Sequence, residues 1–185
     1  MRLIPVAALF LMLLIGCERY EASEDERLDM NSFTREWTGP YGGVPNFTDL
    51  NLNDLKSALI MGMEQTRSEI YEIANQSEKP TFENTILALE ETGRLLDRVF
   101  SYYGVLSSNL STPEFRTIQE SMAPKISQFY AEINHDNKIF KRIEHLFTNK
   151  ELLALDKEQE RLLTLKYKNL VRNGAALSDS QKRRY

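Results

Sequence analysis

The two histidines of the chain, His135 and His145, are the side chains best suited to bind a transition metal. In the metal-binding pattern His-Glu-x-x-His, two imidazoles one helical turn apart face the same ion, and the glutamate activates a bound water. Neither histidine is followed by glutamate, and neither has a second histidine four residues further on. The inverted pattern is excluded as well, because the residue three positions before Glu144 is Lys141. We therefore predict two partly exposed, hydrogen-bonded histidines and no zinc site in this chain.

Paired carboxylates can act as general acid and base, and Glu90, Glu91 and Asp97 are the candidates for such chemistry. They lie on a predicted helix whose opposite face is apolar, a pattern that favours a solvated charged face. Ser107 and Ser108 have no histidine at a spacing that suits activation of a nucleophile. We therefore predict no catalytic residue in this sequence.

The amino terminus has the pattern of an export signal. Arg2 gives a short positive region, and residues 3–15 are an apolar run of thirteen residues. Such a run is shorter than the roughly 20 apolar residues that span a bilayer. It has the length of the apolar core of a cleaved signal peptide.

The end of this segment, Leu14-Ile15-Gly16-Cys17, resembles the bacterial lipobox, in which residues 1–16 are removed and the cysteine thiol carries a diacylglycerol. The alternative is an ordinary signal peptide with a chance cysteine. Several acyl chains on one residue anchor a protein stably, whereas one short chain is marginal. We predict that Cys17 is a lipid-attachment site. The protein is then a membrane-anchored lipoprotein of the bacterial cell envelope, on the periplasmic side.

Length and charge narrow the class of protein. A net charge of −4 and a pI near 5.4 argue against a nucleic-acid-binding surface, which is basic. The residues after the signal are enough for one domain that buries roughly 70% of its extended-chain surface. Cys17 is the only cysteine, so no disulfide can form once it is lipidated, and packing alone must stabilise the fold.

Two segments without regular structure are predicted between the signal and the first helix. Residues 17–36 comprise the lipidated cysteine and a flexible tether, because charged and small polar residues there bury too little surface to offset the entropy of ordering. Residues 37–48 are predicted to be an irregular arm, because their glycines and prolines exclude helix and central strand. Trp37, Tyr41 and Phe47 are expected to attach this arm to the domain by burying their rings.

From residue 49 onward the apolar residues are spaced as in helices, which predicts an all-α fold. Thr81 is a predicted N-cap without the usual Glu or Gln partner, since Asn84 stands at that position. Between Thr81 and residue 110 the apolar residues repeat every seven positions, a seam that packs antiparallel neighbouring helices. The first stripe comprises Leu52, Leu55, Leu59, Met63, Thr66, Ile70 and Ile73, and the seam comprises Phe82, Ile86, Leu89, Gly93, Leu96, Phe100 and Tyr103.

Three more helices are predicted after the seam. Thr112-Pro113-Glu114 starts one of them, and Pro124 within it predicts a kink or a break. A further helix ends at Asn173-Gly174 in the manner of a C-cap. The last begins at Ser178-Asp179 and has only about two turns, with Lys182-Arg183-Arg184 expected on its outer face. A helix this short needs a packed continuation, so we predict that residues 49–185 are a truncated helical domain.

Several of these segments resemble one family of peptidases. The residues from Trp37 to Pro45 (WTGPYGGVP) and from Pro80 to Glu90 (PTFENTILALE) look like the amino-terminal signature of bacterial peptidyl-dipeptidases, of the thimet oligopeptidase family. Residues 93–99 (GRLLDRV), 123–125 (APK) and 172–178 (RNGAALS) continue the match in order. One departure is Asn46, where a second proline is expected after Pro45.

This resemblance implies a larger protein. The full-length relatives are two-lobed, nearly all-helical zinc enzymes that release dipeptides from the carboxyl end of oligopeptides, and their amino-terminal helices roof a deep channel. The antiparallel helices of this chain then form the amino-terminal lobe. The implied partners of this chain are the membrane, oligopeptide substrates and a missing catalytic lobe. Nucleic acid is not an expected partner. No zinc ligand of the family can be placed on a residue of this chain, so we expect the chain alone to be inactive. The alternatives are a non-catalytic helical binding module of the envelope or the product of a disrupted gene.

Overall fold

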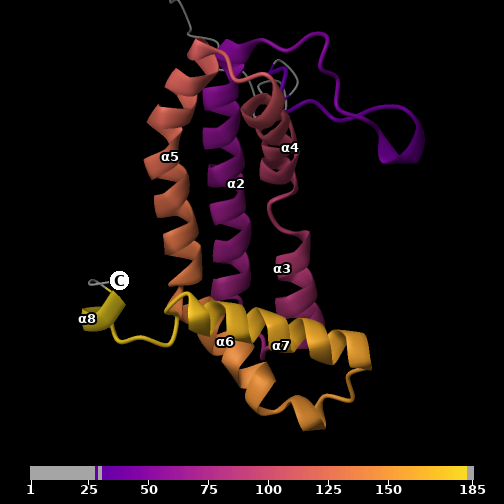
Figure 1. Ribbon diagram of the computed structural model, residues 1–185. Helices are drawn as coiled ribbons and strands as arrows, with labels where there is room; N and C mark the ends of the chain where they lie inside the picture. Colours follow the sequence, from indigo (N-terminus) through magenta and orange to yellow (C-terminus); the bar gives the residue numbers. More distant parts are fainter. Residues whose placement is uncertain (1–27, 29–30, 183–185) are drawn as a thin grey trace, which may run out of the picture.

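A computed structural model of the chain describes residue 28 and residues 31–182, and these residues form a helical fold (Figure 1). The all-α prediction is confirmed: within the described residues the β structure is limited to one isolated bridge, between Thr38 and Val44. The α-helices are α2 (Leu55–Asn75), α3 (Ala88–Glu91), α4 (Arg94–Asn109), α5 (Pro113–Asn134), α6 (Asn137–Thr148), α7 (Lys157–Arg172) and α8 (Asp179–Lys182). Short 3-10 turns span Pro40–Gly42, Leu52–Asp54 and Lys150–Leu152, and a π-helix spans Phe82–Leu87.

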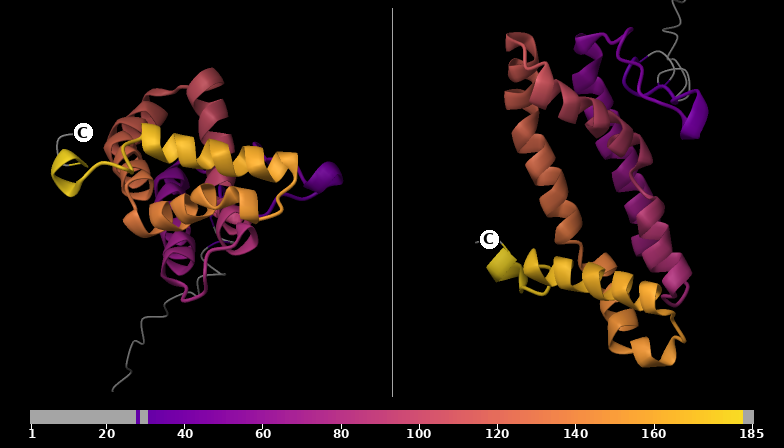
Figure 2. Two further views of the ribbon diagram at one scale, coloured as in Figure 1. Left: turned by 90° about the horizontal axis from the view of Figure 1, so that it is seen from below. Right: turned by 45° about the vertical axis from the view of Figure 1, so that its right-hand side comes forward.

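The helices form two groups. The long helices α2, α4 and α5 alternate in direction along the body of the molecule, with α2 between the other two in the view of Figure 1. The pair α6 and α7 crosses their lower ends (Figure 2). None of the helices that the structure describes is long and apolar enough to cross a membrane.

Each group of helices encloses its own apolar core. The upper core, between α2, α4 and α5, comprises Phe33, Leu55, Ala58, Leu59, Met63, Leu96, Val99, Tyr102, Phe115, Met122 and Phe129. The lower core, where α6 and α7 meet the ends of α2 and the π-helix, comprises Ile70, Ile73, Ala74, Phe82, Ile86, Ile139, Ile143, Leu146 and Leu163. Helix α2 contributes to both cores, which explains why its apolar stripe runs along its whole length.

The predicted stripe on α2 is confirmed, since every member from Leu55 to Ile73 is buried. The small residues of α2 also determine how closely it packs against α4. An added Cβ at Gly62 would lie 3.0 Å from the Leu96 Cα on α4. The glycine therefore lets the two helix backbones approach closely.

The seam of apolar residues after Thr81 packs as predicted but is not one helix. The chain leaves the helical path at Thr92 and turns at Gly93, whose φ of 78° is in the left-handed region that favours glycine. The buried Gly93 N–H donates a 2.7 Å hydrogen bond to the Glu69 carboxylate on α2. The break separates α3 from α4 while Leu96 stays in the upper core.

The two predicted caps are confirmed. Thr112 caps α5 with its side chain on the Phe115 N–H. Thr81 accepts from the Asn84 N–H at 3.1 Å, and the Asn84 side-chain oxygen accepts from the Thr81 N–H at 2.8 Å. The cap has no Glu or Gln, as predicted, but Asn84 completes the capping box, because its side-chain oxygen occupies the place of a Glu or Gln oxygen.

Of the kink or break predicted at Pro124, the break does not occur, since α5 continues from Pro113 to Asn134. Proline lacks the N–H that would bond to the carbonyl of Glu120. Both residues are exposed, so water can satisfy that carbonyl.

The amino-terminal segments differ from the predictions in two places. Residues 31–34 are buried rather than solvated, and Phe33 is fully inaccessible in the upper core. The Asn31 side chain donates 3.0 Å hydrogen bonds to the Asp54 carbonyl and the Ser57 hydroxyl. In the arm, Trp37 packs against the upper core but Tyr41 is completely exposed, so the prediction that Tyr41 attaches the arm is wrong.

The carboxyl-terminal end of the described chain holds a further correction. Gly174, at φ 86°, follows α7 as the predicted C-cap. The Lys182 ammonium on α8 is not on an outer face, because it donates to the His135 carbonyl at 3.1 Å and to the Asn137 side chain at 2.5 Å. Arg183 and Arg184 lie outside the described residues.

Candidate functional site

The two histidines lie at different places near the base of the molecule. His135 follows the end of α5, is partly exposed, and has Nε2 2.9 Å from the Asn173 carbonyl oxygen, as predicted. His145 is exposed on α6. Among the described residues no group of three or more His, Cys, Asp and Glu side chains is placed to hold a metal ion. Cys17, the predicted lipid-attachment site, lies outside the described residues.

The candidate acids are surface residues, as the solvated-face interpretation predicts. Glu90 pairs with Lys166 on α7 at 2.5 Å, and Glu91 lies 3.7 Å from Arg94. Both carboxylates therefore have cationic partners. Asp97 is exposed on α4.

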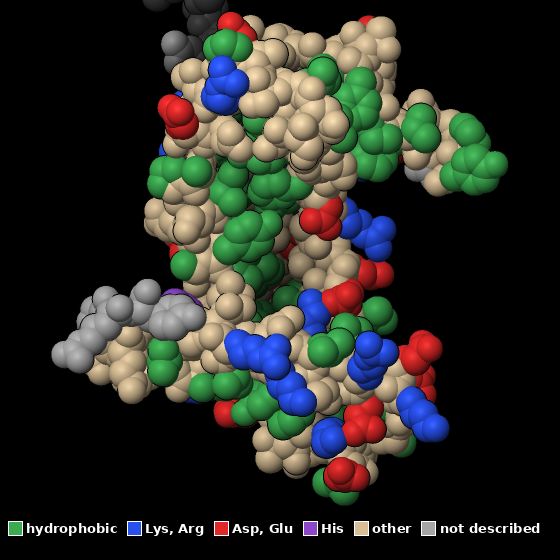
Figure 3. Space-filling view, viewed as in Figure 1, with side chains coloured by type: hydrophobic (Ala, Val, Ile, Leu, Met, Phe, Trp, Pro, Cys, Tyr) green, Lys and Arg blue, Asp and Glu red, His purple; other side chains and the backbone are tan. Residues whose placement is uncertain are grey.

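An apolar face lies between α4 and α5, and its position is what the sequence does not indicate. Figure 3 shows hydrophobic side chains gathered along this face, above α7. A chain of ring contacts crosses it: Phe115 to Tyr103 at 5.3 Å, Tyr103 to Phe100 at 5.8 Å, and Phe100 to Tyr130 at 6.4 Å between centroids. We call these four residues the aromatic row. Phe100 and Tyr130 are stacked with 27° between their planes and join the two helices.

The aromatic row is only partly covered. Tyr130 is 46% exposed, and Phe100 and Tyr103 are also accessible. Burial raises the pKa of the Tyr130 phenol, and the charge of Asp97 raises it further. Contiguous exposed apolar surface rimmed by polar residues is typical of an interaction surface. In the sequence, the regular spacing of Phe100 and Tyr103 indicates the helical seam and not the contact with Tyr130.

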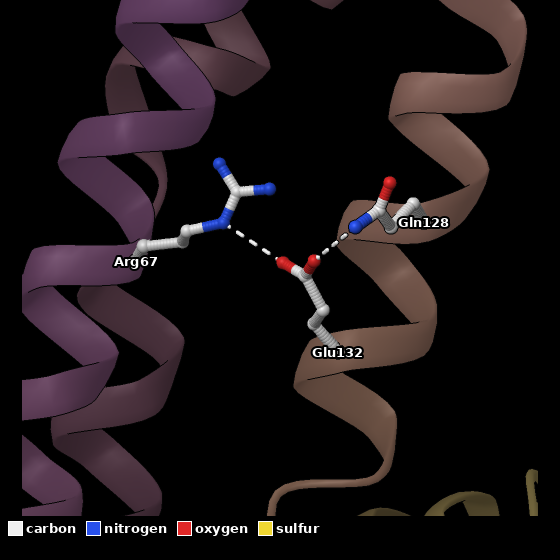
Figure 4. Close-up of polar contacts among 3 residues, drawn as sticks. All are labelled: Arg67, Gln128 and Glu132. Carbon is white, nitrogen blue, oxygen red and sulfur yellow. Dashed lines mark hydrogen bonds and ion pairs between the residues drawn. The ribbon is translucent and has the colours of Figure 1, made fainter.

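A polar contact links α5, one of the two helices that carry this face, to α2. Arg67 Nε on α2 lies 2.9 Å from a Glu132 oxygen on α5, and Gln128 donates to the other oxygen at 2.9 Å (Figure 4). The Arg67 guanidinium also lies 5.0 Å from the centre of the Phe129 ring. The ion pair and the ring contact both join α2 to α5, but the pair is exposed to solvent and contributes little stability on its own.

A second polar contact, at the lower core, joins α6 to the loop after α2 and to the start of the π-helix. Arg142 on α6 is only 8% exposed, and its guanidinium donates to the carbonyls of Gln76 and Glu78 at 3.4 and 3.2 Å. It also donates to Thr85 Oγ1 at 3.2 Å and to Asn84 Oδ1 at 2.9 Å. Burial lowers the pKa of Arg142, and the charge of Glu78 opposes that shift. The arginine thus holds the loop after α2 and the start of the π-helix against α6.

Comparison with known proteins decides the family. Residues 58–182 match the family described as "Neurolysin/Thimet oligopeptidase, N-terminal domain". The chain belongs to this family. The match begins within α2 and ends at the last residue of α8, so it covers the whole lower core, most of the upper core, the aromatic row and Arg142. Residues 31–57, which include the arm and the upper-core residues Phe33 and Leu55, precede it.

The curated relatives are named as peptidases. The chain is 32% identical to "Dipeptidyl carboxypeptidase" of Escherichia coli (strain K12) over 153 residues, which are 83% of this chain and 22% of the relative. It is 29% identical to "Dipeptidyl carboxypeptidase" of Salmonella typhimurium over 76% of this chain and 21% of the relative. "Oligopeptidase A" of Escherichia coli is 21% identical over 77% of this chain and 21% of its own length. The chain therefore spans about a fifth of the length of these relatives.

Proposed function

We propose that this chain is the amino-terminal helical lobe of a zinc-dependent peptidyl-dipeptidase, an enzyme that releases dipeptides from the carboxyl end of oligopeptides. The observation that carries the proposal is the 32% identity over 83% of the chain to a dipeptidyl carboxypeptidase, together with the family match over residues 58–182. In this proposal the helices serve as a roof over a substrate channel, and the hydrolytic chemistry belongs to a catalytic lobe outside these residues.

The donor groups of the described residues do not fit a zinc ion. A catalytic zinc site has three protein ligands and an open position. His135 and His145 lie on different elements and no third ligand joins them. We therefore assign no step of hydrolysis to a residue of this chain.

The aromatic row is the proposed contact surface for the catalytic lobe. Fully buried interface cores are rich in aromatic residues and poor in charge. Phe100 and Tyr130 supply such a centre, and the Arg67–Glu132 pair links α5 to α2. A rigid face of this kind can pack on a second lobe without rearrangement.

A lipid anchor at Cys17 is the proposed means of localisation. The lipobox-like residues that end at Cys17 support an anchored protein of the bacterial cell envelope, on the periplasmic side. The substrates in this setting are short peptides that reach the envelope.

A chimera tests the proposed role. Residues 58–182 replace the matching region of the Escherichia coli dipeptidyl carboxypeptidase, and release of dipeptides from an oligopeptide is measured with and without a chelator. We expect chelator-sensitive release by the chimera and none by the full chain alone. Tyr130→Asp in the chimera should reduce release, whereas Leu152→Asp, at an 82% exposed position between α6 and α7, should not.

Two results count against the proposal. Chelator-sensitive turnover by the chain alone would show that the chemistry lies within it. A folded but inactive chimera would argue against the role as an amino-terminal lobe and favour a separate binding module.

The DNA after codon 185 gives an independent test, because we expect it to encode His-Glu-x-x-His in frame or after a single shift.

A further inference from the structure

Helix α7 carries a row of cations on the side that faces away from the lower core. Lys157, Arg161 and Lys168 have the spacing of residues on one side of a helix, and all three are exposed. Arg172 extends the row by one turn and has an interaction of its own. On the opposite side of α7, Leu163 is fully buried in the lower core. We call the four cations the basic stripe.

Nearby acids do not balance the basic stripe. Among the described residues, no ion pair involves its first three members. Two acids, Glu158 and Glu160, lie in the first turn of α7, and Glu160 already pairs with Lys150 at 2.6 Å. The whole helix has five Lys and Arg residues against these two acids, in a chain whose net charge is −4. Figure 3 shows Lys and Arg side chains spread over α7.

The spacing of these cations is unfavourable for an isolated helix. Like charges four residues apart destabilise a helix, and the stripe contains two such pairs, Lys157 with Arg161 and Lys168 with Arg172. Exposed helix faces that only contact water commonly alternate acids and bases at this spacing. Positive charge gathered on one exposed face therefore indicates a negatively charged partner, which would relieve the repulsion.

Apolar side chains exposed beside the cations select the kind of partner. Leu165 is 48% exposed and Val171 is 38% exposed. An open hollow of about 300 Å³ on this face is lined by Lys157, Glu160, Arg161, Thr164 and Leu165. A leucine gains little beside carboxylates or phosphates in water, but it loses contact with water where lipid headgroups meet acyl chains. Cations and apolar groups on one helix face therefore suit a lipid surface that carries negative charge.

We propose that the basic stripe of α7 binds an anionic phospholipid surface, with Leu165 entering the boundary between headgroups and acyl chains. The stripe uses α7, whereas the surface proposed for the catalytic lobe uses α4 and α5. The binding is a property of α7 and is tested without acyl chains. It rests on the proposed anchor at Cys17 only for the place where it acts.

That anchor leaves α7 within reach of the bilayer. Leu28, whose carbonyl accepts from Thr34, lies beside the upper core, and α7 crosses the lower ends of the long helices. These two places are separated by about the length of α2, whose 21 residues extend for roughly 32 Å. The eleven peptide units from Cys17 to Leu28 can span at most about 40 Å. A lipid on Cys17 and contact of α7 with the same bilayer are therefore compatible.

Partition into vesicles tests the proposal. The full chain with Cys17→Ser is mixed with vesicles of phosphatidylcholine, or of phosphatidylcholine and phosphatidylglycerol in equal amounts, at low and high salt. We expect binding at least about tenfold tighter to the anionic vesicles at low salt, and a smaller preference at high salt. Equal binding to both kinds of vesicle overturns the proposal. Tighter binding to poly-L-glutamate than to anionic vesicles, at equal concentrations of charge, overturns it in favour of an acidic protein partner.

Matched variants separate the stripe from the apolar residues at the amino terminus, which are the same in every sample. Arg161→Gln with Lys168→Gln should lower the preference for anionic vesicles about tenfold to thirtyfold. Lys56→Gln with Lys125→Gln removes the same charge at exposed positions of α2 and α5, and should change the preference much less. Circular dichroism checks that each variant is folded. Equal effects of the two pairs would show that net charge alone decides binding, which overturns the assignment to α7.

The apolar part of the contact has its own variant. Leu165→Gln should weaken binding to anionic vesicles about threefold to tenfold at both salt concentrations, because its contribution does not depend on charge. Unchanged binding would contradict the insertion of Leu165. Dipeptide release by the chimera and lipid labelling of Cys17 are measured without these vesicles, so a failure of the stripe to bind lipid is distinguishable from a failure of either proposal.

Discussion

The backbone N–H of Gly93 and the carboxylate of Glu69 join the turn between α3 and α4 to the middle of α2. The carboxylate has a second contact, since its other oxygen accepts from Gln65 at 3.0 Å. Gly93 is buried, and Glu69 is the acceptor that the structure gives its N–H. The side chain thus acts as a cap supplied by a different helix, for a turn that has no side-chain cap of its own.

Removal of this acceptor should destabilise the domain. Glu69→Ala leaves the buried Gly93 N–H unpaired, at a cost of about 1–3 kcal/mol in the free energy of unfolding. Glu69→Gln keeps an acceptor oxygen and should cost less. Urea denaturation measures both, with Glu72→Ala at an exposed site of α2 as the control. Equal stability of Glu69→Ala and the control would show that the bond contributes nothing.

Two helical glycines should respond in opposite directions to alanine. Gly62→Ala places a methyl group 3.0 Å from the Leu96 Cα and 3.1 Å from its Cδ1, so α2 and α4 must separate. We expect a loss of about 1–3 kcal/mol. Gly104→Ala on α4 meets nothing within 4 Å and should stabilise the protein by about 0.5–1 kcal/mol, through helix propensity alone. Thermal unfolding of the pair separates packing from propensity, and a stabilised Gly62→Ala would contradict the close approach.

Arg142 should be among the least replaceable polar residues. Arg142→Ala removes a donor from four acceptors in or beside the lower core, and of these only Asn84 Oδ1 keeps another backbone donor, the Thr81 N–H. We expect a loss of about 2–4 kcal/mol. Arg142→Lys keeps the charge, but a compact ammonium cannot reach the same four acceptors, so it should recover only part of the loss. The exposed neighbour Lys141→Ala is the control, with an expected change within about 0.5 kcal/mol. Full recovery by lysine would mean that charge matters more than the shape of the guanidinium.

The first turn of α5 should make stability depend on pH. A hydrogen bond from its own backbone N–H, and then one from Thr112, lowers the pKa of Glu114 from its ordinary 4.5. A group whose pKa is lower in the folded state stabilises the protein above the unfolded pKa, and this contribution is lost as the pH falls through the folded pKa. Glu114→Gln should therefore be less stable than the wild type near pH 7 and equal to it in strong acid. Glu120→Gln makes the same charge change on the same helix and serves as the control for general charge effects.

The helices could be predicted because their signals are local. Leu55, Leu59 and Met63 repeat on one face of α2, and such a face has only one favourable place, which is against the core. The cap at Thr112 followed from the two residues after it for the same reason. Such predictions need no knowledge of which other helix supplies the partner.

The features that were missed depend on partners far away in the sequence. The turn at Gly93 depends on its hydrogen bond to Glu69. Gly93 also keeps the seven-residue spacing of the apolar seam, so the sequence gives no sign that the helix breaks there. Phe33 was assigned to a solvated segment because its neighbours are polar, yet Tyr102 on α4 gives its ring a place in the core. The aromatic row likewise needs Phe100 and Tyr130 to be brought together from two helices.

Lipid attachment at Cys17 is the prediction that bears most directly on where the protein acts. The full chain expressed in a bacterium should incorporate radiolabelled palmitate and sediment with membranes. Cys17→Ser should do neither, because each buried methylene of the acyl chains contributes about 0.8 kcal/mol to anchoring and all of them depend on that thiol. The double variant Cys17→Ser with Ser23→Cys keeps one cysteine but moves it out of the lipobox pattern, and it should behave as Cys17→Ser does. Membrane association of Cys17→Ser equal to that of the wild type would mean that residues 1–17 are an ordinary signal with a chance cysteine, whereas labelling of the double variant would mean that the pattern around the cysteine does not direct the modification.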